Sequence, residues 1–168
     1  CRTPKAVVEN NDPEAAEASQ EAAVVDVAVE GLSQSNLDIL EVLKEVLKDF
    51  NPPPGALDDL PQVTIGPGDI QRACRLAKDD PRLGMSQLSL LACVDYLEYF
   101  QIVYILPSLD PDRTAVIKTD VPYETAALPS VTSVWRAADW YEREAHDLFG
   151  VHFEGHPDLS PLLLYEGF

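Results

Sequence analysis

No apolar run in the sequence is long enough to cross a membrane, since the longest candidate, residues 88–94, is interrupted by Ser89 and followed by Asp95. Basic residues are also few: 12 Lys and Arg stand against 29 Asp and Glu, a formal net charge of −17. Nucleic acids and anionic membranes bind through basic side chains, so this composition argues against both and permits a basic protein partner. No basic and then hydrophobic stretch opens the chain, so no secretory signal is expected, and Cys1 in place of Met is typical of a processed or partial chain.

Cysteine is scarce, and the glycine motifs of nucleotide sites are missing. Cys1, Cys74 and Cys93 lie far apart without a CxxC pair, which argues against a disulfide framework, a cysteine zinc site and a self-contained iron–sulfur cluster. The sequence contains no GxGxxG, phosphate-loop or GxSxG motif. We therefore expect no cofactor and no catalytic residue on this chain.

Composition divides the chain near residue 33. Residues 1–33 hold seven acids, two bases and no aromatic residue, which predicts a disordered, acidic, low-complexity extension. Residues 34–168 carry periodic apolar patterns and are predicted to form one domain.

Two helices and a short strand are predicted in the first half of that domain. Leucines recur at helical spacing after Ser35, which is placed to cap a helix over residues 35–50. The segment 51–55, Asn-Pro-Pro-Pro-Gly, ends this helix and forms a stiff connection. A strand at 63–65 and a turn at 66–69 precede a second helix, which stops near Asp80 and carries four residues inward: Ile70, Ala73, Cys74 and Ala77.

Three strands and a last helix are predicted in the second half. The strands lie at 88–94, 99–106 and 114–118, and an irregular bridge follows over 123–129. Ser130 or Ser133 can cap a helix that runs to about Phe149 and stops at Gly150. The order predicts an α+β, two-layer fold with helices packed on one face of a small mixed sheet. The inward stripe of the last helix is predicted as Val131, Val134, Ala138, Tyr141, Ala145 and Leu148.

Charge is concentrated in the last helix. Arg143 is its one base among four acids, and Asp139 and Asp147 lie four residues to either side, so Arg143 can bridge both. Such a helix is either a salt-bridged, solvated face or, where a partner packs on it, an interface fixed by the guanidinium. Glu142 and Glu144 project about 200° apart on a helix and form no acid–base pair.

The histidines give a weaker metal signal. Glu142 and His146 are one helical turn apart and are followed by His152 and His156, a possible ligand cluster. The turn residues Gly150, Gly155 and Pro157 break any regular spacing between them, so no metal site is expected. Gly155-His156-Pro157 is interpreted as a turn.

Residues 135–167, called the signature segment below, carry a family resemblance. Two runs matter most: residues 142–151, Glu-Arg-Glu-Ala-His-Asp-Leu-Phe-Gly-Val, and residues 153–159, Phe-Glu-Gly-His-Pro-Asp-Leu. Together with residues 129–131, 135 and 137–140, they resemble the pattern that identifies the thirty-kilodalton (C) subunit of respiratory-chain NADH dehydrogenase. The resemblance marks twelve residues as signature or interface positions: Trp140, Glu142, Arg143, Glu144, Asp147, Phe149, Gly150, Phe153, Gly155, His156, Pro157 and Leu159.

The resemblance implies a non-catalytic structural subunit in the hydrophilic arm of a proton-pumping NADH:quinone oxidoreductase (complex I). Its expected partners are the D-like (49-kilodalton) subunit, the B-like iron–sulfur subunit near the quinone-reducing end and, as a third candidate, the I-like ferredoxin subunit. FMN, iron–sulfur clusters and quinone are expected on other subunits. The expected location is peripheral, on the cytoplasmic side of the inner or plasma membrane, or on the matrix or stroma side in an organelle.

Other interpretations stay open. The signature is shared with the equivalent subunit of a membrane-bound hydrogenase, a formate hydrogenlyase or another quinone reductase not fed by NADH. Two hypotheses belong to other functional classes. One is a metal-dependent enzyme that uses Glu142 and the histidines, and the other is a free-standing acidic interaction domain. The chain departs from the family pattern at Ser160-Pro161, where basic residues are usual, and at Gly167-Phe168, where the family continues into a basic tail.

Overall fold

The structure is a computed structural model that describes residues 29, 31–109 and 113–164. The predicted extension over residues 1–33 lies almost entirely outside the described residues. Within them no helix is long and apolar enough to cross a membrane.

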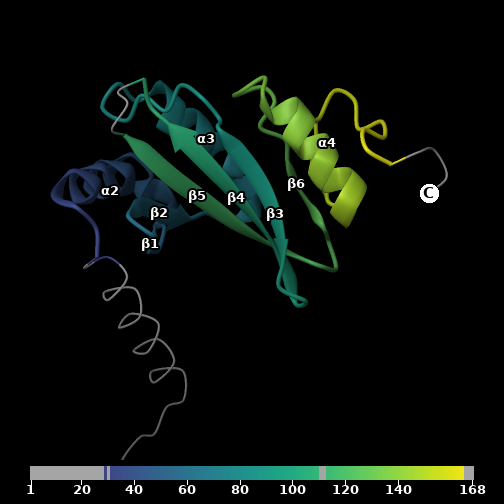
Figure 1. The fold of residues 1–168 in the computed structure, drawn as a ribbon, viewed down its shortest axis with the longest axis horizontal. Helices are drawn as coiled ribbons and strands as arrows, with labels where there is room; N and C mark the ends of the chain where they lie inside the picture. Colours follow the sequence, from purple (N-terminus) through teal and green to yellow (C-terminus); the bar gives the residue numbers. More distant parts are fainter. Residues whose placement is uncertain (1–28, 30, 110–112, 165–168) are drawn as a thin grey trace, which may run out of the picture.

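A mixed sheet of five strands forms the centre of the domain (Figure 1). The strands lie in the order β1-β2-β5-β4-β3, so β1 and β3 are its edges. Only β2 and β5 pair in parallel, and the other neighbours are antiparallel. The strands are β1 (Pro54–Leu57), β2 (Leu60–Thr64), β3 (Leu90–Asp95), β4 (Tyr99–Pro107) and β5 (Thr114–Pro122).

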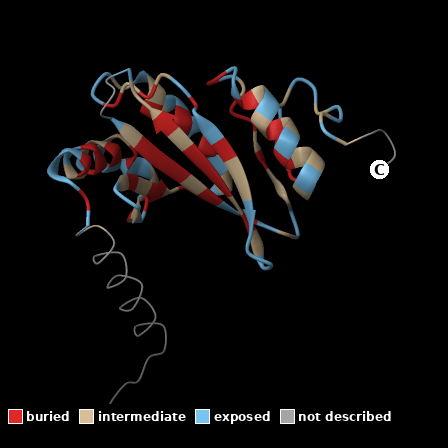
Figure 2. Cartoon of the chain, in the orientation of Figure 1, coloured by how far each residue is buried: buried red, intermediate tan, exposed pale blue. Residues whose placement is uncertain are grey.

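Two helices cover one face of this sheet, behind it in Figure 1. They are α2 (Gln34–Val46) and α3 (Ile70–Asp79), each next to a short 3-10 helix, η1 (Lys48–Phe50) or η2 (Pro67–Asp69). The strands alternate between buried and less buried positions, as a sheet with one covered face does, and α3 buries the four residues predicted to face inward. The burial colours of Figure 2 show the resulting core between the sheet and the helices. The α+β, two-layer prediction is confirmed.

A second, smaller unit lies beside the edge strand β3. It consists of β6 (Ala127–Pro129), α4 (Ala138–Phe149) and β7 (His152–Glu154), with β6 and β7 paired in parallel. Because β7 must return alongside β6, the chain reverses directly after α4. Gly150 makes this reversal with a φ of 74°, and its N–H donates to the carbonyl of His146. The helix end predicted at Gly150 is confirmed.

In the first half of the domain, the structure differs from two predictions. The first helix begins at Gln34, and Ser33, not Ser35, precedes it without a side-chain cap. The last two residues of the segment predicted as a stiff connection, Pro54 and Gly55, belong to β1, which pairs with β2 across a turn at Asp58 (φ 52°). Proline is tolerated here because β1 is an edge strand and Pro54 is its first residue.

In the second half of the domain, the last helix begins later than predicted. The helix begins at Ala138, not at Ser130 or Ser133. Side chains of α3 bind the carbonyls that a longer helix would use: Gln71 Nε2 donates to Ser130 O at 2.7 Å, and Lys78 Nζ donates to Val134 O at 2.6 Å. The predicted irregular bridge also contains β6, and β5 runs on to Pro122, four residues past its predicted end at Lys118.

The predicted inward stripe of that helix is right at four of six positions. Val131, Val134, Ala138 and Ala145 are buried. Leu148 is 51% exposed, so its placement in the core was wrong. Tyr141 is half-buried, and its hydroxyl donates to the carbonyl of Ser89.

We predict that Gly150→Ala lowers the free energy of unfolding by about 1–2 kcal/mol, because a Cβ is disfavoured at a positive φ. Gly66→Ala is the matched control: its φ is −60° and no atom stands near the added methyl, so a small gain of about 0.4–1 kcal/mol is expected. Urea unfolding of both variants measures the two effects. Equal stability of the two variants would contradict the prediction.

Candidate functional site: a buried polar network around helix α4

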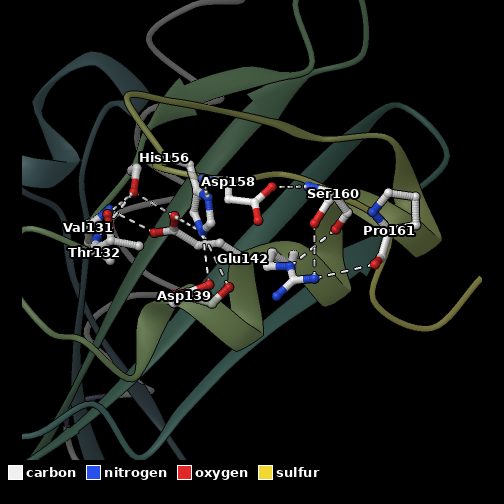
Figure 3. A network of polar contacts seen from close by, with 10 residues as sticks. Val131, Thr132, Asp139, Glu142, His156, Asp158, Ser160 and Pro161 are labelled. Carbon is white, nitrogen blue, oxygen red and sulfur yellow. Dashed lines mark hydrogen bonds and ion pairs between the residues drawn. The ribbon is translucent and has the colours of Figure 1, made fainter.

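The carboxyl group of Glu142 lies at the centre of a polar network (Figure 3). Glu142 is fully buried. Its Oε2 accepts a hydrogen bond from Ser130 Oγ at 2.6 Å, and its Oε1 accepts one from the N–H of Val131 at 2.7 Å. The carboxyl thus holds the loop before α4 against the middle of the helix. Sequence reasoning placed this residue among the signature positions but did not predict that it is buried.

Burial governs the charge of this carboxyl. Loss of solvation raises the pKa of Glu142 to about 7, although the hydrogen bonds from Ser130 and Val131 favour the ionised form, and the nearby carboxyl of Asp139 raises the pKa further. The group therefore changes charge near neutral pH.

His156 binds the turn after β7 to the same helix. Its side chain is fully buried, and its Nε2 lies 3.3 Å from the carbonyl oxygen of Asp139 and 3.9 Å from Glu142 Oε2. Its Nδ1 accepts the N–H of Asp158 at 3.0 Å, so Nε2 is the nitrogen that carries a proton and donates. The Gly155-His156-Pro157 turn is as predicted, with a φ of 78° at Gly155.

Arg143 binds the chain that follows this turn. Its Nε donates to the carbonyl of Ser160 at 3.1 Å, and its Nη2 donates to Ser160 Oγ and to the carbonyl of Pro161, both at 3.3 Å. The predicted bridge from Arg143 to two acids is wrong: no ion pair joins it to Asp139 or Asp147 within the described part of the chain. The guanidinium donates hydrogen bonds to backbone carbonyls that lie outside any β-strand.

Asp147, one turn further along α4, binds the next residues of the same segment. Its Oδ2 accepts three backbone N–H groups, from Leu162 and Leu163 at 2.7 Å and from Leu164 at 3.2 Å. These bonds lower the pKa of Asp147, Leu163 contributing most. Arg143 and Asp147 together fix residues 160–164 along the helix.

The three histidines lie in two separate places in the structure. His156 meets Glu142, while His146 and His152 lie with their ring centroids 6.4 Å apart, and His146 Nδ1 bonds to the carbonyl of Val151. Across the described residues, no group of three or more His, Cys, Asp or Glu side chains is arranged to hold a metal ion. The ligand cluster considered from the sequence is not brought together.

The remaining signature residues separate into inward and outward positions. Phe153 is buried, and Phe149 and Leu159 pack against the core from half-buried positions. Trp140 is 63% exposed, and Glu144 is exposed on the same side of α4. Ser130 and Val131, the direct partners of Glu142, were not among the predicted site residues. The only signal for them was the 129–131 run within the family pattern.

Burial separates the serine of this network from solvent. A nucleophilic serine needs a base within hydrogen-bond reach and access for a substrate. Glu142 Oε2 is a base within reach of the Ser130 hydroxyl, at 2.6 Å, but both residues are buried, so a substrate has no access to this serine in the structure. The network fixes three segments to α4: the loop before it, the turn after β7, and residues 160–164.

Comparison with known proteins assigns this site to a family. The sequence model of the family described as "Respiratory-chain NADH dehydrogenase, 30 Kd subunit" matches residues 63–168. The chain belongs to this family. The match begins inside β2 and includes the whole network, so the resemblance seen in the signature segment is confirmed.

Curated members of the thirty-kilodalton subunit family, each named as a C subunit of NADH-quinone oxidoreductase, are similar in sequence. The second such subunit of Rhizobium meliloti (strain 1021) is 39% identical over 117 residues, 68% of this chain and 64% of the relative. The one from Rhodopseudomonas palustris (strain TIE-1) is 40% identical over 109 residues, covering 63% and 53%. The second one of Rhizobium etli (strain CIAT 652) is 36% identical over 140 residues, covering 81% and 72%. The chain spans 53–64% of the length of the first two.

Two solved structures share the fold. A trypsin-resistant fragment of Nqo5 superposes with a TM-score of 0.62 at 32% identity, covering 72% of this chain and 99% of the fragment. A chain of the membrane-bound sulfane sulfur reductase, an archaeal respiratory membrane complex, superposes with a TM-score of 0.61 at 24% identity, covering 76% of both chains. The second likeness concerns the fold alone.

We predict that Glu142 makes stability fall as the pH rises from about 4.5 to about 7. The native state holds the Glu142 proton more tightly than the unfolded chain does, so ionisation in this range costs the native state roughly 3 kcal/mol at most. Glu142→Gln removes this dependence. The unfolding free energy of the wild type minus that of the variant should therefore fall as the pH rises from about 4.5 to about 7.

Chemical denaturation at pH 4.5, 5.5, 6.5 and 7.5 measures this difference. Glu144→Gln is the control, because the exposed Glu144 is two residues away on the same helix. For Glu144→Gln, the difference in unfolding free energy from the wild type should not change with pH. If the difference for Glu142→Gln is also independent of pH, Glu142 does not bind its proton more tightly in the native state.

Proposed function

We propose that this chain is a non-catalytic structural subunit in the hydrophilic arm of a proton-pumping NADH:quinone oxidoreductase. The observation that supports the proposal most is how the signature residues are used. The charged side chains of Glu142, Arg143 and Asp147, with His156, bind other segments of the same chain. The family match and the names of the curated relatives support the choice of this complex.

The proposed role is rigidity. A loop and a C-terminal segment hold their course only if their backbone groups are satisfied, and here side chains of one helix satisfy them. In this proposal, FMN, iron–sulfur clusters and quinone are bound by other subunits, and electrons pass through those subunits.

The proposed partners are the D-like (49-kilodalton) subunit, the B-like iron–sulfur subunit near the quinone-reducing end, and the I-like ferredoxin subunit. The excess of acidic residues suits association with basic protein surfaces. The proposed location is peripheral, on the cytoplasmic side of the membrane or on the matrix or stroma side in an organelle.

A second candidate is the equivalent subunit of a respiratory complex with another electron donor, such as a membrane-bound hydrogenase or a formate hydrogenlyase. The likeness to a chain of the sulfane sulfur reductase supports it, because a complex named for different chemistry uses this fold. The network itself does not depend on the electron donor, so it fits both candidates.

Purification of the tagged full-length protein from its native membranes in mild detergent, followed by mass spectrometry, tests the proposal. We expect the D-like and B-like subunits together with NADH-oxidising flavoprotein subunits. A nickel-binding large subunit in their place would favour the second candidate. Recovery of the chain alone would contradict both.

We also predict that Arg143→Ala reduces the yield of the assembled complex more than it reduces the stability of the purified chain. The variant loses three hydrogen bonds to residues 160–161, which are exposed, and the contact of the guanidinium with the ring of Trp140, 5.7 Å from the ring centre. The loss in unfolding free energy is no more than about 1–2 kcal/mol. Residues 160–161 are then released from α4, whereas Asp147 still holds residues 162–164. A partner that binds residues 160–161 in their ordered form therefore loses affinity.

Complex yield and quinone reductase activity, set beside the thermal midpoint of the chain, measure both effects of Arg143→Ala. Arg75→Ala is a suitable control, since among the described residues the Arg75 side chain makes one exposed hydrogen bond, to Ser133, and none to residues 160–164. Equal complex yield from wild type and Arg143→Ala would refute the prediction.

A further inference from the structure

We propose that the outward stripe of α4, formed by Trp140, Glu144 and Leu148, is a docking face for a protein segment that presents one apolar side chain next to a lysine or arginine. The proposal rests on the proposed function in one respect, since it expects that segment to come from another subunit of the same complex.

The stripe is set by helical spacing. Its three residues are four positions apart, so they lie above one another on one side of the helix. Trp140 is 63% exposed and Leu148 is 51% exposed, and both are large apolar side chains. Exposed apolar groups gathered on one face are a mark of interaction sites, and Trp is prominent among residues that contribute most to binding.

A pocket of about 200 Å³ opens beside the stripe, between α4 and the edge strand β3. Glu144 and Leu148 belong both to the stripe and to the lining of this pocket, and Leu90, 40% exposed, lies on the β3 side. The rest of the lining is mainly apolar and comes from both elements. A pocket of this size holds a single branched or aromatic side chain, which is how an anchor residue of a partner binds.

Charge specifies the second half of the ligand. Glu144 is the one ionisable carboxylate in the lining, and no hydrogen bond or ion pair of its side chain is present within the described residues. Its neighbours differ in this: Glu142, Arg143 and Asp147 all have partners within the chain. Arg143 in particular binds Ser160 and Pro161, and its guanidinium lies over the ring of Trp140, 5.7 Å from the ring centre. A cation beside the anchor residue would pair with Glu144, and the acidity of the whole chain disfavours an anionic membrane surface as the occupant.

Two variants on this face and two matched controls test the proposal. Glu144→Lys reverses the charge, and Leu148→Asp places a charge where the apolar contact is expected. Glu41→Lys makes the same reversal at an exposed acid of α2, and Leu97→Asp makes the same exchange at a leucine that is 83% exposed in the β3–β4 turn. The readout is the ratio of partner subunits to tagged full-length chain recovered from native membranes, measured by quantitative mass spectrometry.

We expect each variant on this face to lower that ratio at least about tenfold, and each control to leave it within about twofold. Thermal midpoints of the recovered chains separate lost binding from lost folding, and Glu144→Gln, which keeps the shape, should lower the ratio by a smaller factor. Recovery of partners by wild type and by both variants alike would overturn the docking face. Failure of the wild type itself to recover respiratory subunits would overturn the proposed function instead.

A photoreactive benzophenone side chain in place of Leu148, in the same complex, reports the chemistry of the occupant. The crosslinked peptide should come from another subunit and should contain an apolar residue with a lysine or arginine within a few positions. A crosslinked peptide without a basic residue, or crosslinking only to this chain, would overturn the proposed ligand.

Discussion

The buried carboxyl of Glu142 is the group on which the courses of the loop before α4 and of the turn after β7 depend. An ionisable group without solvent is costly unless hydrogen-bond donors surround it, and here Ser130 and Val131 supply them from the loop before α4. His156, packed 3.9 Å away, brings in the turn after β7. Because each of these segments is irregular, none has a sheet or helix of its own to fix it. The contacts with one helix take that place.

The helix therefore has two kinds of surface. Its inner and lateral sides use Glu142, Arg143 and Asp147 to satisfy backbone and side-chain groups of the same chain. Its outer side leaves Trp140 and Glu144 in solvent. Removal of an inner residue should disturb the fold or the course of the C-terminal segment, whereas replacement of an outer one should disturb only association. The two kinds of variant therefore give different evidence about the same helix.

Periodic patterns predicted the regular elements well and their boundaries less well. The four inward residues of α3 and the end of α4 at Gly150 follow from apolar spacing and from glycine, and both were correct. The hairpin of β1 and β2 was missed because prolines hide a strand that lies at a sheet edge. The start of α4 was missed because Gln71 and Lys78, more than fifty residues away in the chain, bind the carbonyls before it.

The family follows from many matching positions in residues 129–159, and the fold class follows from the spacing of apolar residues. The roles of the charged signature residues, in contrast, become visible only in the folded chain. Helical spacing offered Arg143 two acids as neighbours, yet its guanidinium binds Ser160 and Pro161, and Asp147 binds three N–H groups further on. Those partners lie on a segment that returns to the helix only after the turn at Gly155. Local spacing cannot show them, because long-range packing decides which backbone groups come within reach of the helix.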